Sequence, residues 1–340
     1  MSKLSLPIST VLIVCSLLVT NFPFMAVHGQ INTTSLVSTR NNFDLDSGNL
    51  TSGHNSTDYI QFGVPGLEPM TSCPSEIAIY VHGVGANPVQ AQEQVDRTKL
   101  TLMTDHYNIP VIGFSWDSNT PFGDEGWNTA KKIADQNGPK LAHFLTDYMI
   151  ACKQHHQDTK IRIVGHSLGA RVVFSSLLNL DKSQTWINNG FKITSVDLLG
   201  AAINDDVPSR NTAVGRAIED VVIKFFNLYD PRDVMLLAEY GPTEDHDALG
   251  LNGAQSVAHP SNYAEQDVES SKMQLQDASG IPQPECLDFV VPAGWILTRS
   301  GWTYTETDNH CGYMGFRDPF NLNSIVSDGA MRSVITSWQQ

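Results

Sequence analysis

The chain has 340 residues, of which 41% are hydrophobic, and it carries a formal net charge of −15 at pH 7. Such an acidic chain, without a cluster of basic residues, is not expected to bind nucleic acid, because affinity for the phosphate backbone depends on Lys and Arg. The five cysteines include no Cys-x-x-Cys pair, which disfavours a structural zinc site. The composition after the first 58 residues is that of a globular protein.

Residues 1–29 have the features of a signal peptide. Lys3 is their only charge, residues 11–19 are apolar, and residues 27–29 supply small or permissive side chains at a cleavage point. We therefore expect a secreted protein. If the segment stays uncleaved, it would instead anchor the protein at the outer cell surface, although two prolines and an asparagine leave its apolar stretch short of the roughly 20 residues that span a bilayer.

Residues 30–58 are rich in Asn, Ser, Thr and Gly and contain few large apolar side chains, so we predict a flexible arm. Asn-x-Ser/Thr sequences begin at Asn32, Asn49 and Asn55. In an exposed segment of an exported protein these sequences are acceptors for N-linked glycans. The same composition would also produce some of them by chance.

Residues 59–340 are predicted to form one domain in which strands alternate with helices. The expected strands are residues 77–81, 111–115, 161–164, 193–199 and 221–228, and the expected helices are residues 90–102, residues 127–152 and a helix after residue 164. This alternation predicts an α/β fold with a mostly parallel central sheet and helices on both faces.

The run Gly-His-Ser-Leu-Gly at residues 165–169 lies between a predicted strand and a predicted helix. Its glycines permit a tight turn that lifts the hydroxyl of Ser167 clear of the backbone, and the helix behind it aims its first N–H groups at the same place. A Gly-x-Ser-x-Gly pattern occurs by chance in about one in ten chains of this length, given glycine near 7%. The strand before it and the helix after it therefore carry the prediction of a nucleophile.

Backbone donors for an oxyanion are predicted at two places. The strand at residues 77–81 ends in His-Gly-Val-Gly, and the glycines let the backbone approach a ligand closely. The N–H of Val84 could then join the N–H of Leu168, which follows the candidate nucleophile. The alternative interpretation is an ordinary glycine-rich turn.

Two aspartates follow the strand at residues 221–228, at the end where open α/β sheets place their sites. One of the two, Asp230 or Asp233, could serve only to cap a turn around Pro231. Asp233 has more loop before it, from which a carboxylate can reach sideways to a histidine. Asp233 is therefore the preferred acid and Asp230 the alternative.

The chain has eleven histidines, and three of them follow these aspartates: His246, His259 and His310. His310 belongs to a short polar turn, Asp-Asn-His-Cys-Gly-Tyr, near the end of the chain. We therefore prefer His310 as the base that would activate Ser167.

Together these segments resemble the α/β-hydrolase fold superfamily, and more narrowly its exported lipase-like and esterase-like serine hydrolases. The resemblance covers about residues 59–340 and rests on the runs at residues 82–85 and 165–169 and on the order Ser167, Asp233, His310. Shorter runs, Trp-Asp-Ser, Leu-Gly-Ala-Ala and Asn-His-Cys-Gly-Tyr, add to it. The segment at residues 241–283 is long and acidic and does not match a standard lid, which leaves the substrate class open.

The resemblance implies a catalytic domain that hydrolyses carboxylic esters, of small molecules or of lipids, through an acyl-enzyme. Ser167 would be the nucleophile, His310 the base and Asp233 its acid, with Val84 and Leu168 as oxyanion donors. Neither a cofactor nor a metal is implied. The alternatives are a binding module on the cell surface that keeps the fold without catalysis, and a peptidase with the same triad.

The resemblance also implies a disulfide pairing. In the resembled fold the strand at residues 77–81 lies beside that at residues 161–164, so Cys73 and Cys152 would meet near the amino edge of the sheet. Cys286 would then pair with Cys311, directly after the candidate base. Disulfides are the expected state of cysteines in an exported protein.

Overall fold

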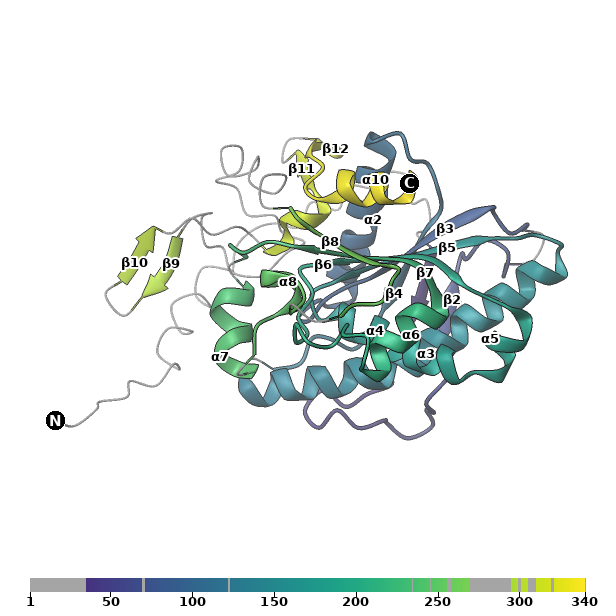
Figure 1. The fold of residues 1–340 in the computed structure, drawn as a ribbon, viewed down its shortest axis with the longest axis horizontal. Helices are drawn as coiled ribbons and strands as arrows, with labels where there is room; N and C mark the ends of the chain where they lie inside the picture. The colour runs from purple at the N-terminus through teal and green to yellow at the C-terminus, as the bar shows by residue number, and fades with distance from the viewer. Residues whose placement is uncertain are drawn as a thin grey trace. The chain divides into compact units, whose positions relative to one another are not determined.

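The computed structural model in Figure 1 describes residues 35–339 except 69–70, 122, 234, 245, 256–257, 269–294, 299–300, 305–309 and 319–320. An eight-stranded sheet dominates it, in the order β2-β1-β4-β3-β5-β6-β7-β8. Neighbouring strands run parallel except β1 and β2, which are antiparallel. The strands are β1 (Ser35–Ser38), β2 (Ile60–Phe62), β3 (Glu76–Val81), β4 (Val111–Ser115), β5 (Lys160–His166), β6 (Ile193–Leu199), β7 (Val222–Tyr229) and β8 (Tyr263–Asp267).

Helices cover both faces of the sheet, as the sequence predicts (Figure 1). One face carries α2 (Pro88–Thr104) and α10 (Met331–Gln339), and the other carries α3 (Asp124–Gln154), α4 (Gly169–Lys182), α5 (Gln184–Asn189) and α6 (Ala213–Val221). The shorter helices are the π-helical turn η2 (Leu236–Tyr240), α7 (Gly241–Glu244), α8 (Leu249–Asn252) and the 3-10 helix η3 (His310–Met314). Two further pairs of antiparallel strands are β9 (Trp295–Thr298) with β10 (Gly301–Tyr304) and β11 (Phe316–Asp318) with β12 (Asn321–Ser327).

Strand β3 shows why the sheet is buried on both sides. Successive side chains of a strand point to opposite faces. Ile77, Ile79 and Val81 therefore pack in the core between the sheet and helices α3 and α4. Ala78 and Tyr80 pack on the opposite face, between the sheet and helices α2 and α10. From Ile77 to Val81 both faces of β3 carry buried side chains, as is typical of a sheet covered by helices on both sides.

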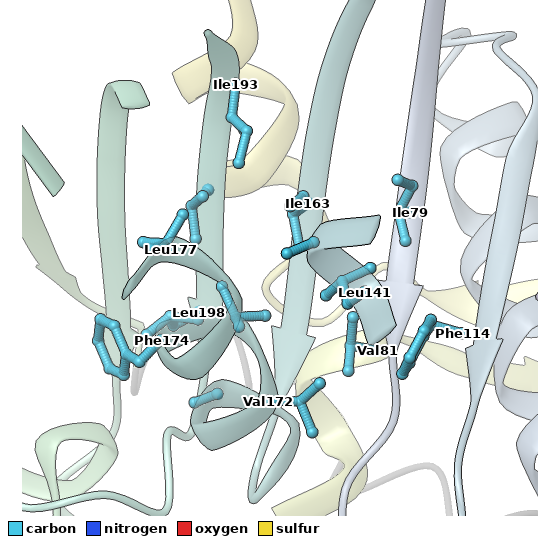
Figure 2. Packing of buried hydrophobic residues seen from close by; sticks show 14 of the residues in the cluster. Ile79, Val81, Phe114, Leu141, Ile163, Val172, Phe174, Leu177, Ile193 and Leu198 are labelled. Carbon is cyan, nitrogen blue, oxygen red and sulfur yellow. The ribbon is translucent and has the colours of Figure 1, made fainter. Parts of the chain in front are cut away.

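The larger core lies between the sheet and helices α3 and α4 (Figure 2). Each fully buried aliphatic or aromatic side chain contributes about 1.5–3 kcal/mol to folding. In the close view, side chains from four neighbouring strands meet those of the two helices: Ile79, Val81, Phe114, Ile163, Ile193 and Leu198 from the sheet, and Leu141, Val172, Phe174 and Leu177 from the helices. This packing fixes α4 directly behind the turn that follows β5.

The predicted flexible arm is wrong for residues 35–58. Ser35–Ser38 forms β1 inside the sheet, between β2 and β4. The few apolar side chains of this segment are well placed, because Val37 and Phe43 are both buried. The buried Lys140 of α3 forms an ion pair with Asp58 and ties the end of the segment to that helix. A composition average hides such sparse but buried contacts.

Asn49 and Asn55 are both exposed, and Asn32 lies outside the described residues. Glycosylation at these asparagines stays a prediction. Residues 1–29, on which the signal peptide prediction depends, also lie outside the described residues. Within the described part of the chain, no helix is both long enough and apolar enough to cross a membrane.

The predicted disulfide between Cys73 and Cys152 is confirmed, with the two Cα atoms 5.5 Å apart. It joins the segments that lead into β3 and β5, whose first residues pair in the sheet. Cys311 is also disulfide-bonded. Cys286 lies outside the described residues, so the pairing of Cys286 with Cys311 stays a prediction.

A buried carboxylate holds the C-terminal helix on the sheet. Asp197 of β6 accepts hydrogen bonds from Ser337 Oγ at 2.7 Å and from Trp338 Nε1 at 2.6 Å, both in α10, and from Ser195 Oγ at 3.1 Å. Burial raises the pKa of Asp197 to about 6, although its three donors act in the opposite direction. The folded protein therefore binds a proton here more tightly than the unfolded chain does.

This raised pKa predicts a loss of stability as the pH increases. The stabilisation from the bound proton is complete below the unfolded pKa of 3.8 and is lost as the pH rises through about 6. Between pH 4 and pH 7 the wild-type protein should lose up to about 3 kcal/mol relative to Asp197→Asn, which has no such proton to lose. Urea unfolding of both proteins at several pH values measures this difference. A difference that does not change with pH would contradict the prediction.

Candidate active site

Ser167 stands at the apex of the turn between β5 and α4, as the sequence predicts. Its φ angle is 54°, in the left-handed region that residues other than glycine rarely adopt. The turn is also crowded, because an added Cβ at Gly169 would lie 2.4 Å from the Val81 carbonyl oxygen and one at Gly83 would lie 2.7 Å from the Cβ of Ser167. The strain at Ser167 therefore depends on close backbone packing that only glycines permit.

Hydrogen bonds to the end of β6 hold this strained residue in place. The backbone N–H of Ser167 donates to the carbonyl of Leu199 at 3.0 Å, and the N–H of Ala202 donates to the carbonyl of Ser167 at 3.2 Å. The turn after β5 is thus joined to the turn after β6. Both lie at the carboxyl ends of parallel strands, where α/β proteins place their sites.

His310 forms a buried pair with Asp233. Its Nδ1 lies 2.6 Å from Oδ2 of Asp233, and the two side chains are 3% and 0% exposed. The other carboxylate oxygen, Oδ1, accepts the backbone N–H groups of Met235 at 3.1 Å and Leu236 at 3.2 Å. With one oxygen fixed to the backbone, the second can hold Nδ1–H and leave Nε2 to accept a proton.

Asp230 has a different role. Its Oδ1 accepts the backbone N–H of Arg232 at 2.8 Å, and its carbonyl accepts the N–H of Asp233 at 3.1 Å. These bonds close the turn around Pro231. The structure therefore pairs the histidine with Asp233, and Asp230 shapes the loop that presents it.

The two other candidate histidines have other surroundings. His246 is exposed. The Nε2 of His259 lies 3.0 Å from the carbonyl of Gln255, and its ring packs on Tyr263.

His166, which the sequence reasoning did not single out, links the histidine to the serine turn. Its Nε2 donates to the carbonyl of His310 at 3.1 Å, and the two rings have centroids 4.8 Å apart. Burial, with the neighbouring His310 second, keeps the pKa of His166 well below its usual value, so the ring is neutral. Because His166 directly precedes Ser167, this bond brings the base and the nucleophile to one place. In the sequence, the only signal for this role of His166 was its position next to the candidate nucleophile.

Gly200 completes the convergence. An added Cβ there would lie 2.6 Å from the ring of Tyr313 and 3.2 Å from Oδ2 of Asp233. Gly200 also directly follows Leu199, whose carbonyl holds Ser167. The acid and the serine therefore both adjoin the turn that follows β6, and the base is paired with the acid.

The backbone N–H groups of Val84 and Leu168, the two predicted oxyanion donors, are available to a ligand. Within the described residues, neither the N–H of Val84 nor that of Leu168 has a hydrogen-bond acceptor. Leu168 stands at the start of α4, whose positive end adds to the attraction for an anion. Val84 belongs to the loop at residues 82–87, called here the β3 loop. The N–H of Gly85 in this loop donates to the carbonyl of Ser118 at 2.8 Å.

The described residues contain no group of three His, Cys, Asp or Glu side chains that could hold a metal ion. The candidate side chains are the hydroxyl of Ser167 and the imidazole of His310 paired with the carboxylate of Asp233. Their arrangement suits the activation of a nucleophile by proton transfer.

The fold and the site define the class: an α/β protein with a serine and an aspartate that follow the carboxyl ends of parallel strands, and a buried histidine that pairs with the aspartate. Residues 19–273 match the family described as "Protein of unknown function (DUF726)", and the chain belongs to this family. The match includes Ser167 and Asp233 and ends before His310. A comparison with curated proteins finds no match.

Among solved structures, the chain is similar to a lipase-esterase related protein from Clostridium acetobutylicum ATCC 824. The two share 12% sequence identity over 57% of this chain and 85% of that chain, with a TM-score of 0.28. A similarity at this level does not bear on the activity of the chain.

The crowding at Gly169 leads to a stability prediction with a matched control. Gly169→Ala places a methyl group against a backbone carbonyl that cannot move away, and should cost about 1–3 kcal/mol. Gly241→Ala adds the same methyl group in open space within α7 and should be neutral or slightly stabilising. Thermal unfolding of both variants tests the prediction, and equal melting temperatures would contradict it.

Proposed function

We propose that the protein is a serine hydrolase that cleaves carboxylic esters of small molecules or lipids, with the α/β-hydrolase fold. The observation that supports this most is the buried pair of His310 and Asp233, joined through His166 to a serine in a strained turn. The unused N–H groups of Val84 and Leu168 add the donors that acyl transfer requires.

In this proposal the hydroxyl oxygen of Ser167 attacks the acyl carbon while Nε2 of His310 accepts its proton. Asp233 stabilises the resulting imidazolium through Nδ1–H, without taking the proton itself. The carbonyl oxygen of the ester becomes an oxyanion, which accepts hydrogen bonds from Val84 and Leu168. A single donor of this kind is worth about 10²–10³ in kcat.

The tetrahedral intermediate then collapses. The bond from carbon to the alcohol oxygen breaks, and His310 gives its proton to the leaving alcohol, which forms the acyl-enzyme on Ser167. A water molecule that gives a proton to His310 attacks the acyl carbon, and the second collapse returns that proton to Ser167 and releases the acid. Each step is balanced without a cofactor.

The proposal includes action outside the cell, either as a secreted protein or at the outer cell surface. The disulfide between Cys73 and Cys152 supports it, because disulfides persist in oxidising compartments. The signal-like features of residues 1–29 point the same way.

The role of Ser167 can be tested by covalent labelling. A fluorophosphonate probe should label the folded wild-type protein once per chain, and Ser167→Ala should abolish both labelling and the hydrolysis of p-nitrophenyl esters. Ser176→Ala is a matched control, because Ser176 is a buried serine of α4 whose Oγ makes no hydrogen bond within the described residues. This control should label like the wild type.

Three results would contradict the proposal. Labelling of folded Ser167→Ala would place the nucleophile elsewhere. Absence of labelling in the folded wild type would argue against a serine hydrolase and favour a binding module. A labelled protein that cleaves peptides but no ester of any chain length would be a peptidase.

The choice of acid gives a second test. Asp233→Asn should lower kcat by about 10⁴, because an amide in this place favours the wrong tautomer of His310. Asp230→Asn should lower kcat far less, because Asp230 accepts a backbone N–H in its turn, whereas the carboxylate that pairs with His310 is that of Asp233. Melting temperatures of both variants separate a catalytic loss from unfolding. A larger loss in Asp230→Asn would move the role of the acid to that residue.

A further inference from the structure

Arg40, in the segment after β1, reaches across to the β3 loop. One guanidinium nitrogen, Nη2, lies 3.1 Å from Nε2 of His82 and 2.9 Å from the carbonyl of Ala86. Nε donates to Ser115 Oγ at 2.8 Å, and Nη1 donates to Asn119 Oδ1 at 3.1 Å. The guanidinium group therefore contacts both ends of the β3 loop and also the segment that follows β4.

The backbone around Arg40 is itself fixed. The buried carboxylate of Asp117 accepts the N–H groups of Asn41 and Phe43, each at 3.0 Å. Burial lowers the pKa of Arg40 to about 10, with Asp117 acting in the opposite direction, so the side chain stays charged at neutral pH. Arg40 is thus a rigidly held cation with donors in set directions.

These donors determine how His82 is used. Arginine has no acceptor, so Nη2 must donate to Nε2 of His82, and the backbone N–H of Trp116 donates to the same nitrogen at 3.1 Å. Burial and the adjacent Arg40 keep the pKa of His82 well below its usual value. The ring is therefore neutral and carries its one proton on Nδ1.

That proton acts on the peptide that bears the oxyanion donor. Nδ1–H of His82 donates to the carbonyl of Gly83 at 2.9 Å. The carbonyl of Gly83 and the N–H of Val84 belong to one planar trans peptide group, so they point in opposite directions. A bond that fixes the carbonyl also fixes the direction of the Val84 N–H.

The other end of the loop is held equally firmly. The carbonyl of Ala86 accepts from Arg40 and, at 3.0 Å, from Ser118 Oγ. The next residue, Asn87, caps α2 by accepting the N–H groups of Val89 and Gln90. The short stretch that contains Val84 is therefore suspended between two fixed points.

We propose that Arg40 is a positioning residue for the oxyanion site, holding both ends of the β3 loop so that the Val84 N–H faces the substrate. The inference rests on the proposed function and deepens it. The oxyanion forms only during the reaction, so loss of Arg40 should lower kcat and kcat/KM together and leave KM unchanged. A residue that merely stabilised the fold would lower the melting temperature without this kinetic pattern.

The kinetic test uses Arg40→Met and a matched buried arginine. Arg162 lies five residues before Ser167 along β5, about 16 Å away, and binds Glu76 and the carbonyl of Trp338. Arg40→Met should lower kcat for a p-nitrophenyl ester about 10–100-fold and change KM by no more than about twofold. The largest expected loss in kcat equals the smaller effects measured when one oxyanion donor is removed. Arg162→Met should lower the melting temperature and keep kcat within about twofold.

A second measurement does not depend on activity. Hydrogen exchange of a peptide that covers residues 82–87 should be faster in Arg40→Met than in the wild type and unchanged in Arg162→Met. If Arg40→Met does not fold, Arg40→Lys replaces it, and its single amine should give an intermediate rate of exchange and an intermediate kcat.

Unchanged exchange in the folded Arg40 variant would overturn the inference, because the loop would not depend on Arg40. Faster exchange with an unchanged kcat would also overturn it, because the loop would then not position a catalytic donor. If the wild type neither labels nor turns over, the proposed function fails first, and the role of Arg40 as an oxyanion-positioning residue falls with it. Exchange that still accelerates in that case shows that the failure lies in the chemistry and not in the contacts of Arg40.

Discussion

The left-handed backbone at Ser167 is the constraint on which the rest of the site depends. A non-glycine residue adopts such a conformation only where the surrounding structure enforces it. Here β3 and α4 approach so closely that Gly83 and Gly169 have no room for a side chain, and the end of β6 supplies the hydrogen bonds. The core in Figure 2 stabilises this arrangement, because it presses α4 against the sheet just behind the turn.

The parallel sheet explains how residues so distant in sequence meet. Arg40, the β3 loop, the segment after β4, Ser167, and Asp233 each follow the carboxyl end of a strand, from β1, β3, β4, β5 and β7 in turn. In a parallel sheet these ends lie along one edge. Only His310 arrives otherwise, in η3, and it is held there by contacts with Asp233 and His166.

The sequence predicts the central strands well and the edge poorly, for a physical reason. Strands β4 and β6 have the predicted bounds, because they are buried on both faces and therefore consist mostly of apolar residues between polar segments. Strand β1 reads Ser-Leu-Val-Ser within a polar stretch, so composition suggested a flexible arm. Arg40 could not be recognised for the same reason, since its importance comes from contacts with residues some 40 to 80 positions further along the chain.

The two aspartates show where sequence order stops being informative. Both follow β7, both are buried, and they are three residues apart, so order and burial cannot separate their roles. The contacts show that the roles depend on each other. Asp230 closes the turn around Pro231 and accepts the N–H of Asp233, whose side chain pairs with His310. The two aspartates are therefore not alternatives for one role. Asp230 shapes the loop, and the loop places Asp233 against His310.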